Sequence, residues 1–322
     1  MKKILLMALA AAAMVGCSQN EEIDNAAQKA KITFGTVVSN STRATVTSIA
    51  GLQGTGFTVY AYNTGADEAG VANLPVSPFM GDVNGLAVTY NEAKWGFTGT
   101  YYWPSTGNIQ FYAYATDDDA TNYTATGKYP TINYAVAATV GAQKDFVVAK
   151  AENEKKSDNA VDLTFKHALT QINFSATGGD ANLYYKVTAV SIGGAYGAGT
   201  YNFKDGSWET ITTDAVKTYA YLTNGAVSVK KTATVDLVSA DGPLMLIPQT
   251  LADGKIMISY SVYTDEAMTN EIASVTDNLT EGLTTVWGTG KKVRYTLTLN
   301  LKGATVSFAP GISGWDEPEI EG

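Results

Sequence analysis

Cysteine, histidine and arginine are almost absent from this sequence. The 322 residues include one cysteine (Cys17), one histidine (His167) and two arginines (Arg43 and Arg294). A single cysteine excludes an intramolecular disulfide, and the shortage of cysteine and histidine leaves no ligand set for a zinc site. A Ser-His-Asp triad would have to use His167, which lies between core-type residues and is interpreted as structural. We therefore predict that the chain is not an enzyme.

A clustered set of metal ligands is also lacking. Asp117, Asp118 and Asp119 form the only dense acidic cluster in the body of the chain. Calcium needs about six to eight oxygen ligands, which three consecutive residues cannot all direct at one ion, and no calcium-loop motif surrounds them. We interpret the cluster as a solvated loop and expect no metal and no cofactor. Acidic residues are numerous enough for a paired-carboxylate glycosidase, but no motif indicates one.

Positive charge is scarce as well. The formal net charge is −9, with 22 basic side chains against 31 acidic ones. A nucleic-acid-binding surface needs clustered lysine and arginine, so this balance argues against nucleic acid as a partner. Excess negative charge favours a soluble, self-repelling protein at a surface.

Long hydrophobic runs are missing except at the start. Lys2 and Lys3 precede the apolar run from Ile4 to Val15. A membrane-spanning helix needs roughly 20 apolar residues, so this run is too short to be one. A charged start followed by such a run is typical of a secretory signal peptide, which we place at residues 1–16.

The residues after this run resemble the lipobox of bacterial lipoproteins. Val15 and Gly16 stand before Cys17, whose thiol would carry the lipid, although Met14 occupies a position that is usually leucine. Several acyl chains would hold the mature chain on a membrane almost permanently. The alternative is an ordinary secretory signal with an incidental cysteine. We predict a lipidated acidic tether over residues 17–31. Within it, Glu21 to Asp24 is similar to the export signal of surface lipoproteins of the Bacteroides group. The alternative is that these residues are only part of a solvated, flexible tether.

The body of the chain has the composition of strands and turns. It contains 19 tyrosines and 31 glycines, and few segments show the helical period. About 300 residues exceed the usual size of one sandwich, so we predict an all-β protein of two domains, residues 32–168 and 169–322. The main candidate strands are Phe57 to Tyr62, Leu86 to Tyr90, Lys94 to Phe97, Ile109 to Tyr114, Asp145 to Ala149, Val161 to Phe165, Ile172 to Ala176, Lys186 to Ile192, Gly199 to Phe203, Lys255 to Tyr263 and Lys291 to Leu301.

A short strand pattern directly follows the tether. Residues 32–38 alternate, which places Ile32, Phe34, Thr36 and Val38 on one face. Arg43 follows among small polar residues, the composition of an exposed loop that a protease can cut.

Taken in order along the chain, these segments resemble the fimbrillins of Bacteroides-type bacteria, which are subunits of type V pili. The similarity covers nearly the whole chain. It rests on the lipobox, on the strand before Ser41-Thr42-Arg43-Ala44, and on several later motifs. These motifs are Gly56 to Tyr62, Trp95, Tyr102 to Pro104, Phe111 to Tyr114, Asp145 to Ala149, Leu163 to Leu169, Ile247 to Gln249, Tyr295 to Leu299 and Ile312 to Trp315.

The resemblance implies a lipoprotein precursor of two tandem transthyretin-like β-sandwich domains. Such a precursor is anchored to the outer membrane at Cys17 and cut by an arginine-specific protease after Arg43, so that Ala44 becomes the new N-terminus. Removal of the first strand then opens a groove that a strand from a neighbouring fimbrillin fills. The donor is usually C-terminal, here with Val306, Phe308 and Ile312 as candidates. The expected function is a structural subunit of surface fimbriae that support adhesion to a host or bacterial surface.

A different function remains open from the sequence. A surface lipoprotein that keeps its lipid anchor and binds glycans would share the leader, the tether and the β-sandwich domains. Its sugar-stacking platform would consist of Tyr101, Tyr102, Trp103, Tyr112 and Tyr114, whose alternative role is in the sandwich core.

Overall fold

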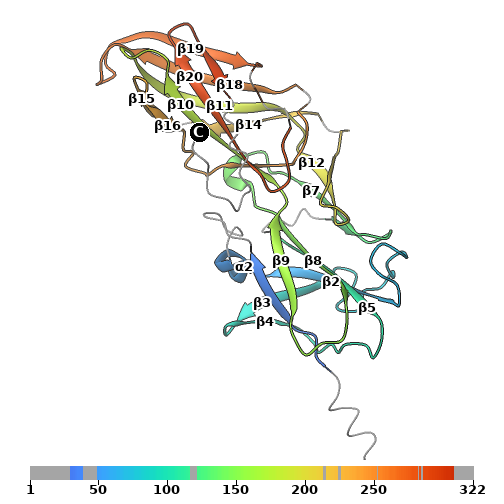
Figure 1. Cartoon of the computed structure of the whole chain (residues 1–322). Coiled ribbons are helices and arrows are strands. Elements are labelled where there is room, and N and C mark those ends of the chain that lie inside the picture. The colour runs from blue at the N-terminus through green and yellow to red at the C-terminus, as the bar shows by residue number, and fades with distance from the viewer. Residues whose placement is uncertain are drawn as a thin grey trace, which may run out of the picture.

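The computed structural model shows an elongated, almost entirely β-stranded molecule (Figure 1). It describes residues 30–38, 49–116, 122–212, 215–223, 226–251, 253–281, 283 and 286–307. Strands from the first half of the chain form one lobe, and strands from the second half form most of the other. The predicted all-β class is confirmed.

A seven-stranded sheet forms the first lobe. One face of this sheet is lined by alternate apolar residues, among them Phe57 and Val59 of β2 and Phe111 of β5. These side chains enclose a core that the short helix α2 (Ile49–Thr55) also covers through the buried Leu52. The strand order is β1 (Phe34–Val38), β9 (Val161–His167), β8 (Val147–Glu154), β5 (Asn108–Ala115), β2 (Phe57–Gly65), β3 (Leu86–Asn91) and β4 (Lys94–Phe97).

The opposite face of this sheet packs on a four-stranded sheet. Phe146 illustrates the contact, because its ring stacks on Tyr134 at 5.0 Å and meets Tyr201 and Trp208 edge-on at about 6 Å. The hairpin of β12 and β13 follows residue 168 in sequence, yet β12 pairs with β7. Backbone pairing therefore crosses the predicted division at 168/169, which stays a prediction. The strand order is β13 (Trp208–Thr210), β12 (Ala198–Asn202), β7 (Thr131–Ala135) and β6 (Asn122–Thr124).

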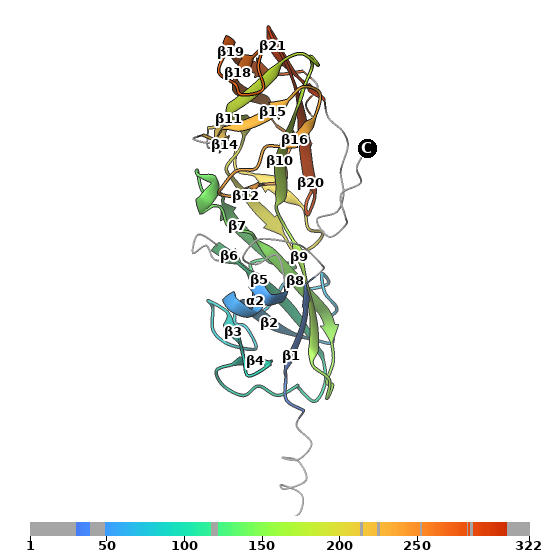
Figure 2. The same ribbon diagram turned by 90° about the vertical axis from the view of Figure 1, so that its left-hand side faces the viewer.

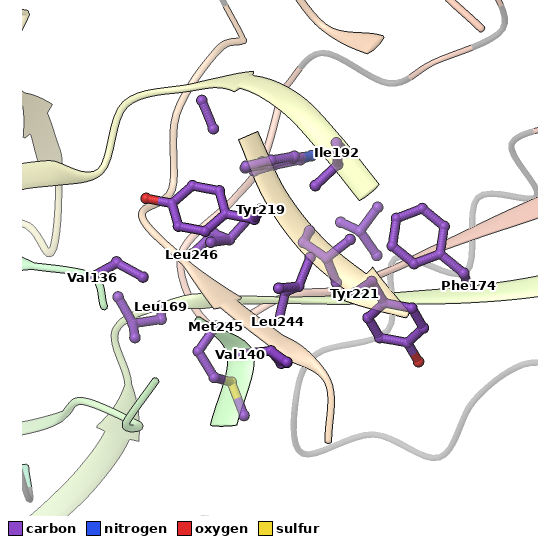
Figure 3. Packing of buried hydrophobic residues seen from close by; sticks show 14 of the residues in the cluster. Val136, Val140, Leu169, Phe174, Ile192, Tyr219, Tyr221, Leu244, Met245 and Leu246 are labelled. Atoms are coloured by element: carbon purple, nitrogen blue, oxygen red, sulfur yellow. The ribbon is translucent and has the colours of Figure 1, made fainter. Parts of the chain in front are cut away.

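The second lobe consists of two facing five-stranded sheets. Every second residue of β18 and β20 is buried, as the period-2 pattern of a half-buried strand requires. In β17, Leu244 and Leu246 lie on the side of Tyr221 and Tyr219, whereas Met245 points toward Val140 (Figure 3). The first sheet has the order β16 (Thr234–Asp236), β10 (Thr170–Gly178), β20 (Lys292–Asn300) and β21 (Gly303–Ser307), and β17 (Leu244–Leu246) also pairs with β10. The second sheet has the order β14 (Lys217–Leu222), β11 (Tyr184–Ala195), β18 (Lys255–Tyr263) and β19 (Glu271–Leu279), and β15 (Val227–Lys230) also pairs with β11.

The first strand of each lobe makes a parallel pair. In the first lobe β1 runs parallel to β9, and in the second lobe β10 runs parallel to β20. Only Ala168 and Leu169 separate β9 from β10, so the chain passes directly from one lobe to the other at this point. A single hydrophobic cluster extends across the junction, which couples the two lobes.

Local turns follow their sequence signals, whereas α2 does not. Glu92 and Ala93 both have positive φ, as a two-residue loop of the predicted β3–β4 hairpin requires. No sequence pattern indicated α2, which is followed by Gly56 with a φ of +75°. A seven-residue helix is too short to show a helical period. Within the described ranges, no helix has the length and hydrophobicity needed to span a bilayer.

Candidate functional site

The segment from Ala30 to Val38 lies in a slot between two other segments of the first lobe. On one side, the amide of Ile32 donates a hydrogen bond to the carbonyl of Tyr101 (2.9 Å), and the amide of Trp103 donates to the carbonyl of Ala30 (3.0 Å). On the other side, the amide of Val161 donates to the carbonyl of Thr33 (2.8 Å). The start of the segment, residues 30–33, is therefore held by backbone hydrogen bonds on both edges, to residues 101–103 on one side and to β9 on the other.

The strand β1 continues this segment along β9. The parallel register runs from Phe34 opposite Val161 to Val38 opposite Phe165, and β1 is the terminal strand of the seven-stranded sheet. Figure 2 shows β1 lying along β9 at this edge. Loss of β1 would expose the backbone groups of β9, which could then pair with another strand.

Side chains of the segment alternate between the core and the solvent. Ile32 and Phe34 are only 2% and 6% exposed, whereas Lys31 and Thr33 are exposed. Thr36 is half-buried, and the side chain of Val38 lies outside the described part of the structure. Burial of two such apolar side chains stabilises the segment by about 3–6 kcal/mol, an upper estimate because unfolded chains already bury some surface.

Phe34 is at the centre of the contact between the segment and the core. Its ring meets those of Phe57, Phe97 and Phe111 edge-on, with centroid distances of 6.0, 5.6 and 5.8 Å. Edge-to-face pairs of this kind stabilise beyond the burial of their area. The slot thus combines an apolar pocket for the Phe34 ring with the backbone groups of β9 along β1 and those of residues 101–103 beside residues 30–32.

Several predicted site residues lie outside the described residues. These are Cys17, Arg43, Ala44, Phe308 and Ile312, and the acidic cluster at 117–119 lies outside them as well. The other arginine is described: Arg294 lies within β20, and its guanidinium Nη1 contacts Asp236 Oδ1 at 2.7 Å.

Val306 lies in the last described strand. It is opposite Leu297 in the antiparallel pairing of β21 with β20, and its half-buried side chain packs against the core of the second lobe. In this structure Val306 therefore completes a sheet of its own chain.

The aromatic residues of the alternative glycan-binding function do not form an exposed platform. Tyr112 is fully buried and Trp103 is 5% exposed, while Tyr101 and Tyr114 are half-buried. Tyr102 is the exposed member, at 39%. Sugar stacking needs accessible ring faces, so these residues act mainly as core.

The single histidine is part of a buried polar pair. The Nδ1 atom of His167 is 2.8 Å from Asp145 Oδ2, and both side chains are almost fully buried. The other oxygen of Asp145 accepts a hydrogen bond from the amide of Phe146 (2.8 Å). The pair fixes the end of β9 where the chain leaves the first lobe. Among the described residues, no group of three or more His, Cys, Asp or Glu side chains could hold a metal ion.

Sequence reasoning missed both neighbours of the first strand. Residues 101–103 and β9 are about 70 and 130 positions away from it, and nothing in either segment marks it as the partner. The alternation of β9 indicated a strand, but periodicity does not choose partners between strands.

The sequence and the fold of this chain are both similar to those of known fimbrial proteins. A family model described as fimbrillin-like matches residues 42–315. The chain is 25% identical to fimbrium subunit Fim1C of Phocaeicola vulgatus over 98% of this chain and 97% of that protein. The crystal structure of a fimbrial protein from Bacteroides vulgatus superposes with a TM-score of 0.68 at 22% identity, covering 88% of this chain and 99% of the other.

Proposed function

Because the chain belongs to the fimbrillin-like family, a family of fimbrial subunits at the cell surface, we propose that it is made as the lipoprotein precursor of such a subunit. The sequence features that support this route are the short signal peptide and the lipobox-like residues before Cys17. A lipid on Cys17 would hold the precursor at the outer membrane until the segment that carries it is cut off.

Cleavage after Arg43 by an arginine-specific protease is the second step of the proposal. Small polar residues surround Arg43, as in loops that proteases cut. Arg294, the other arginine, lies within β20 opposite Asn173 of β10, and its guanidinium contacts Asp236. The backbone around Arg294 is already paired with β10, so it is not available to pair with the substrate cleft of a protease. One cut would release the lipid anchor together with β1.

Assembly by strand exchange is the third step. The observation that carries it is the position of residues 30–38: β1 pairs with β9, residues 30–32 also bond to residues 101–103, and Phe34 fills an apolar pocket. An added strand gains affinity from main-chain hydrogen bonds and specificity from alternate side chains. A C-terminal strand of a neighbouring subunit, with Val306, Phe308 and Ile312 at alternating or nearby positions, would replace β1. In the unprocessed chain β1 occupies the slot and prevents early polymerisation.

Limited proteolysis tests the proposal. The chain that starts at Ser18 keeps every described residue, and an arginine-specific protease should cut it once, between Arg43 and Ala44. The Arg43→Gln variant should resist cleavage and stay monomeric, whereas the matched Arg294→Gln variant should be cut like the parent.

The cut chain should then form oligomers over time, as measured by size-exclusion chromatography and electron microscopy. Oligomers formed equally well by uncut Arg43→Gln would contradict the role of β1 as a protective strand.

A further inference from the structure

A cleft lined by lysines lies at the junction of the two lobes. It has a volume of about 730 Å³ and is bounded by β8, β9, the turn after β12 and the turn before β20. Lys150, Lys166, Lys204 and Lys291 line it, and Asp205 is the one carboxylate among its lining residues. Such a concentration of positive charge is unexpected in a chain whose net charge is −9.

Three of these lysines are not neutralised within the described part of the chain. The ammonium of Lys150 contacts Glu152 Oε2 at 3.0 Å. Lys166, Lys204 and Lys291 have no carboxylate within 4.0 Å among the described residues. Asp205 Oδ1 accepts a hydrogen bond from the amide of Ser207 (3.0 Å), and its carboxylate interacts electrostatically with Lys204 without forming an ion pair within 4.0 Å among the described residues. The cleft therefore has a positive potential that attracts an anion.

The direction of β21 leads toward this cleft. In its antiparallel register, Ala304 lies opposite Leu299 and Ser307 lies opposite Thr296. Each further residue of β21 thus approaches the start of β20, and Lys291 immediately precedes that start. The described chain ends at Ser307, five register positions before the level of Lys291.

The sequence beyond Ser307 ends in the most acidic segment of the C-terminal half. Residues 316–322 contain Asp316, Glu317, Glu319 and Glu321 and no basic residue. Eight residues separate Ser307 from Asp316. Extended, this stretch spans up to about 30 Å, more than the roughly 17 Å that five strand positions cover, so the acidic residues can reach the level of Lys291.

We propose that the lysine cleft is a binding site for a carboxylate-rich peptide, and that its occupant in the unassembled subunit is the acidic segment 316–322 of the same chain. Charge complementarity and the direction of β21 support this occupant. The ion pairs hold the C-terminal segment against its own chain, and they weaken as salt screens them. This inference concerns the isolated monomer and does not depend on cleavage at Arg43.

Zero-length cross-linking tests the proposal directly. A carbodiimide joins a carboxylate to an ammonium only where the two are in contact, and peptide mass spectrometry identifies the pair. The chain starting at Ser18 should give links from residues 316–321 to Lys166, Lys204 or Lys291. These links should decrease several-fold in 1 M NaCl, where the Debye length is about 3 Å. Lys94, an exposed residue of β4 in the other part of the first lobe, serves as the control and should not be linked.

Mixing ¹⁵N-labelled and unlabelled chains shows whether the links lie within one chain. Links mainly between chains, or links to Lys94 as frequent as those to the cleft lysines, would overturn the proposal.

A competing ligand gives a second readout. The variant Asp316→Asn/Glu317→Gln/Glu319→Gln/Glu321→Gln removes the charges that hold the proposed occupant in the cleft. It should bind polygalacturonate about tenfold more tightly than the parent chain, because several exposed ion pairs no longer compete with the added polyanion. The proposed occupant would be wrong if the parent chain and this variant bound polygalacturonate equally well and Lys166→Gln weakened the binding of both to the same extent. The cleft would then be a site for an external polyanion.

Discussion

Replacing Phe34 by alanine tests how strongly the slot holds the first strand. Phe34 is 6% exposed, and its ring contacts those of Phe57, Phe97 and Phe111. Truncation of a buried phenylalanine to alanine costs about 3–5 kcal/mol, because the transfer free energy is lost and a cavity remains. The three aromatic neighbours place the expected cost in the upper part of this range.

The effect is measured on a chain already cut after Arg43, in which only non-covalent contacts hold the segment that contains β1. A loss of about 3–5 kcal/mol corresponds to a rise of roughly 150- to 4,000-fold in the dissociation constant of that segment. The measurement follows release of the segment by size-exclusion chromatography coupled to mass spectrometry, in parallel with oligomer formation. The cut Phe34→Ala chain should lose the segment and form oligomers sooner than the cut parent.

Thr33→Ala is the matched control because Thr33 is the exposed neighbour of Phe34 on the same segment. Surface substitutions usually change stability by less than about 0.5 kcal/mol, so the dissociation constant should change by about twofold or less. If Phe34→Ala and Thr33→Ala release the segment equally, the slot does not hold β1 through the aromatic pocket.

Three further predictions concern the core and the proposed donor strand. Asp145→Ala leaves His167 Nδ1 and the amide of Phe146 without their partner, so the free energy of unfolding should fall by about 2–4 kcal/mol in urea denaturation, whereas the exposed Asp158→Ala should have little effect. Burial raises the pKa of Tyr201 and of Tyr295 to about 12. The unfolded chain therefore loses these protons first, near pH 10, and stability that is present below pH 10 should be lost as pH rises toward 12. Phenolate absorbance from these residues should then appear together with the loss of circular dichroism, and ionisation of all tyrosines at pH 10 in a folded chain would contradict their burial. Phe308→Ala/Ile312→Ala should leave a folded monomer that fails to polymerise after cleavage, and normal polymerisation would exclude these residues as donors.

The sequence predicted individual strands far better than their partners. The sequence correctly indicated β2, β5, β18 and the β3–β4 hairpin. Strand β18 is buried at every second residue, β2 and β5 are apolar strands buried on both faces, and β3 and β4 are joined by a short turn. Strand β19 was missed because its Asp, Asn, Glu and Thr residues are mostly exposed at a sheet edge. Long-range pairing leaves little trace in local sequence, and for this reason neither the insertion of β12 beside β7 nor the parallel pairing of β1 with β9 was foreseen.

Only part of the candidate site could be predicted, because contacts between distant segments leave little trace in the local sequence. Alternation predicted that Ile32 and Phe34 share a face, and both are buried. The aromatic pocket around Phe34 combines residues from β2, β4 and β5, which only the folded sheet brings together. The lysine cleft had no signal in the sequence, because its four lysines come from four separate segments of the chain.

The N-terminal residue of subunits in fimbriae isolated from the cell surface tests the central claim most directly. The proposed processing predicts that Edman sequencing or mass spectrometry finds Ala44 as the first residue, with no peptide from residues 17–43. Fimbrial subunits that all begin at an acylated Cys17 would show that the first strand is kept, and the proposed assembly by strand exchange at this slot would be wrong.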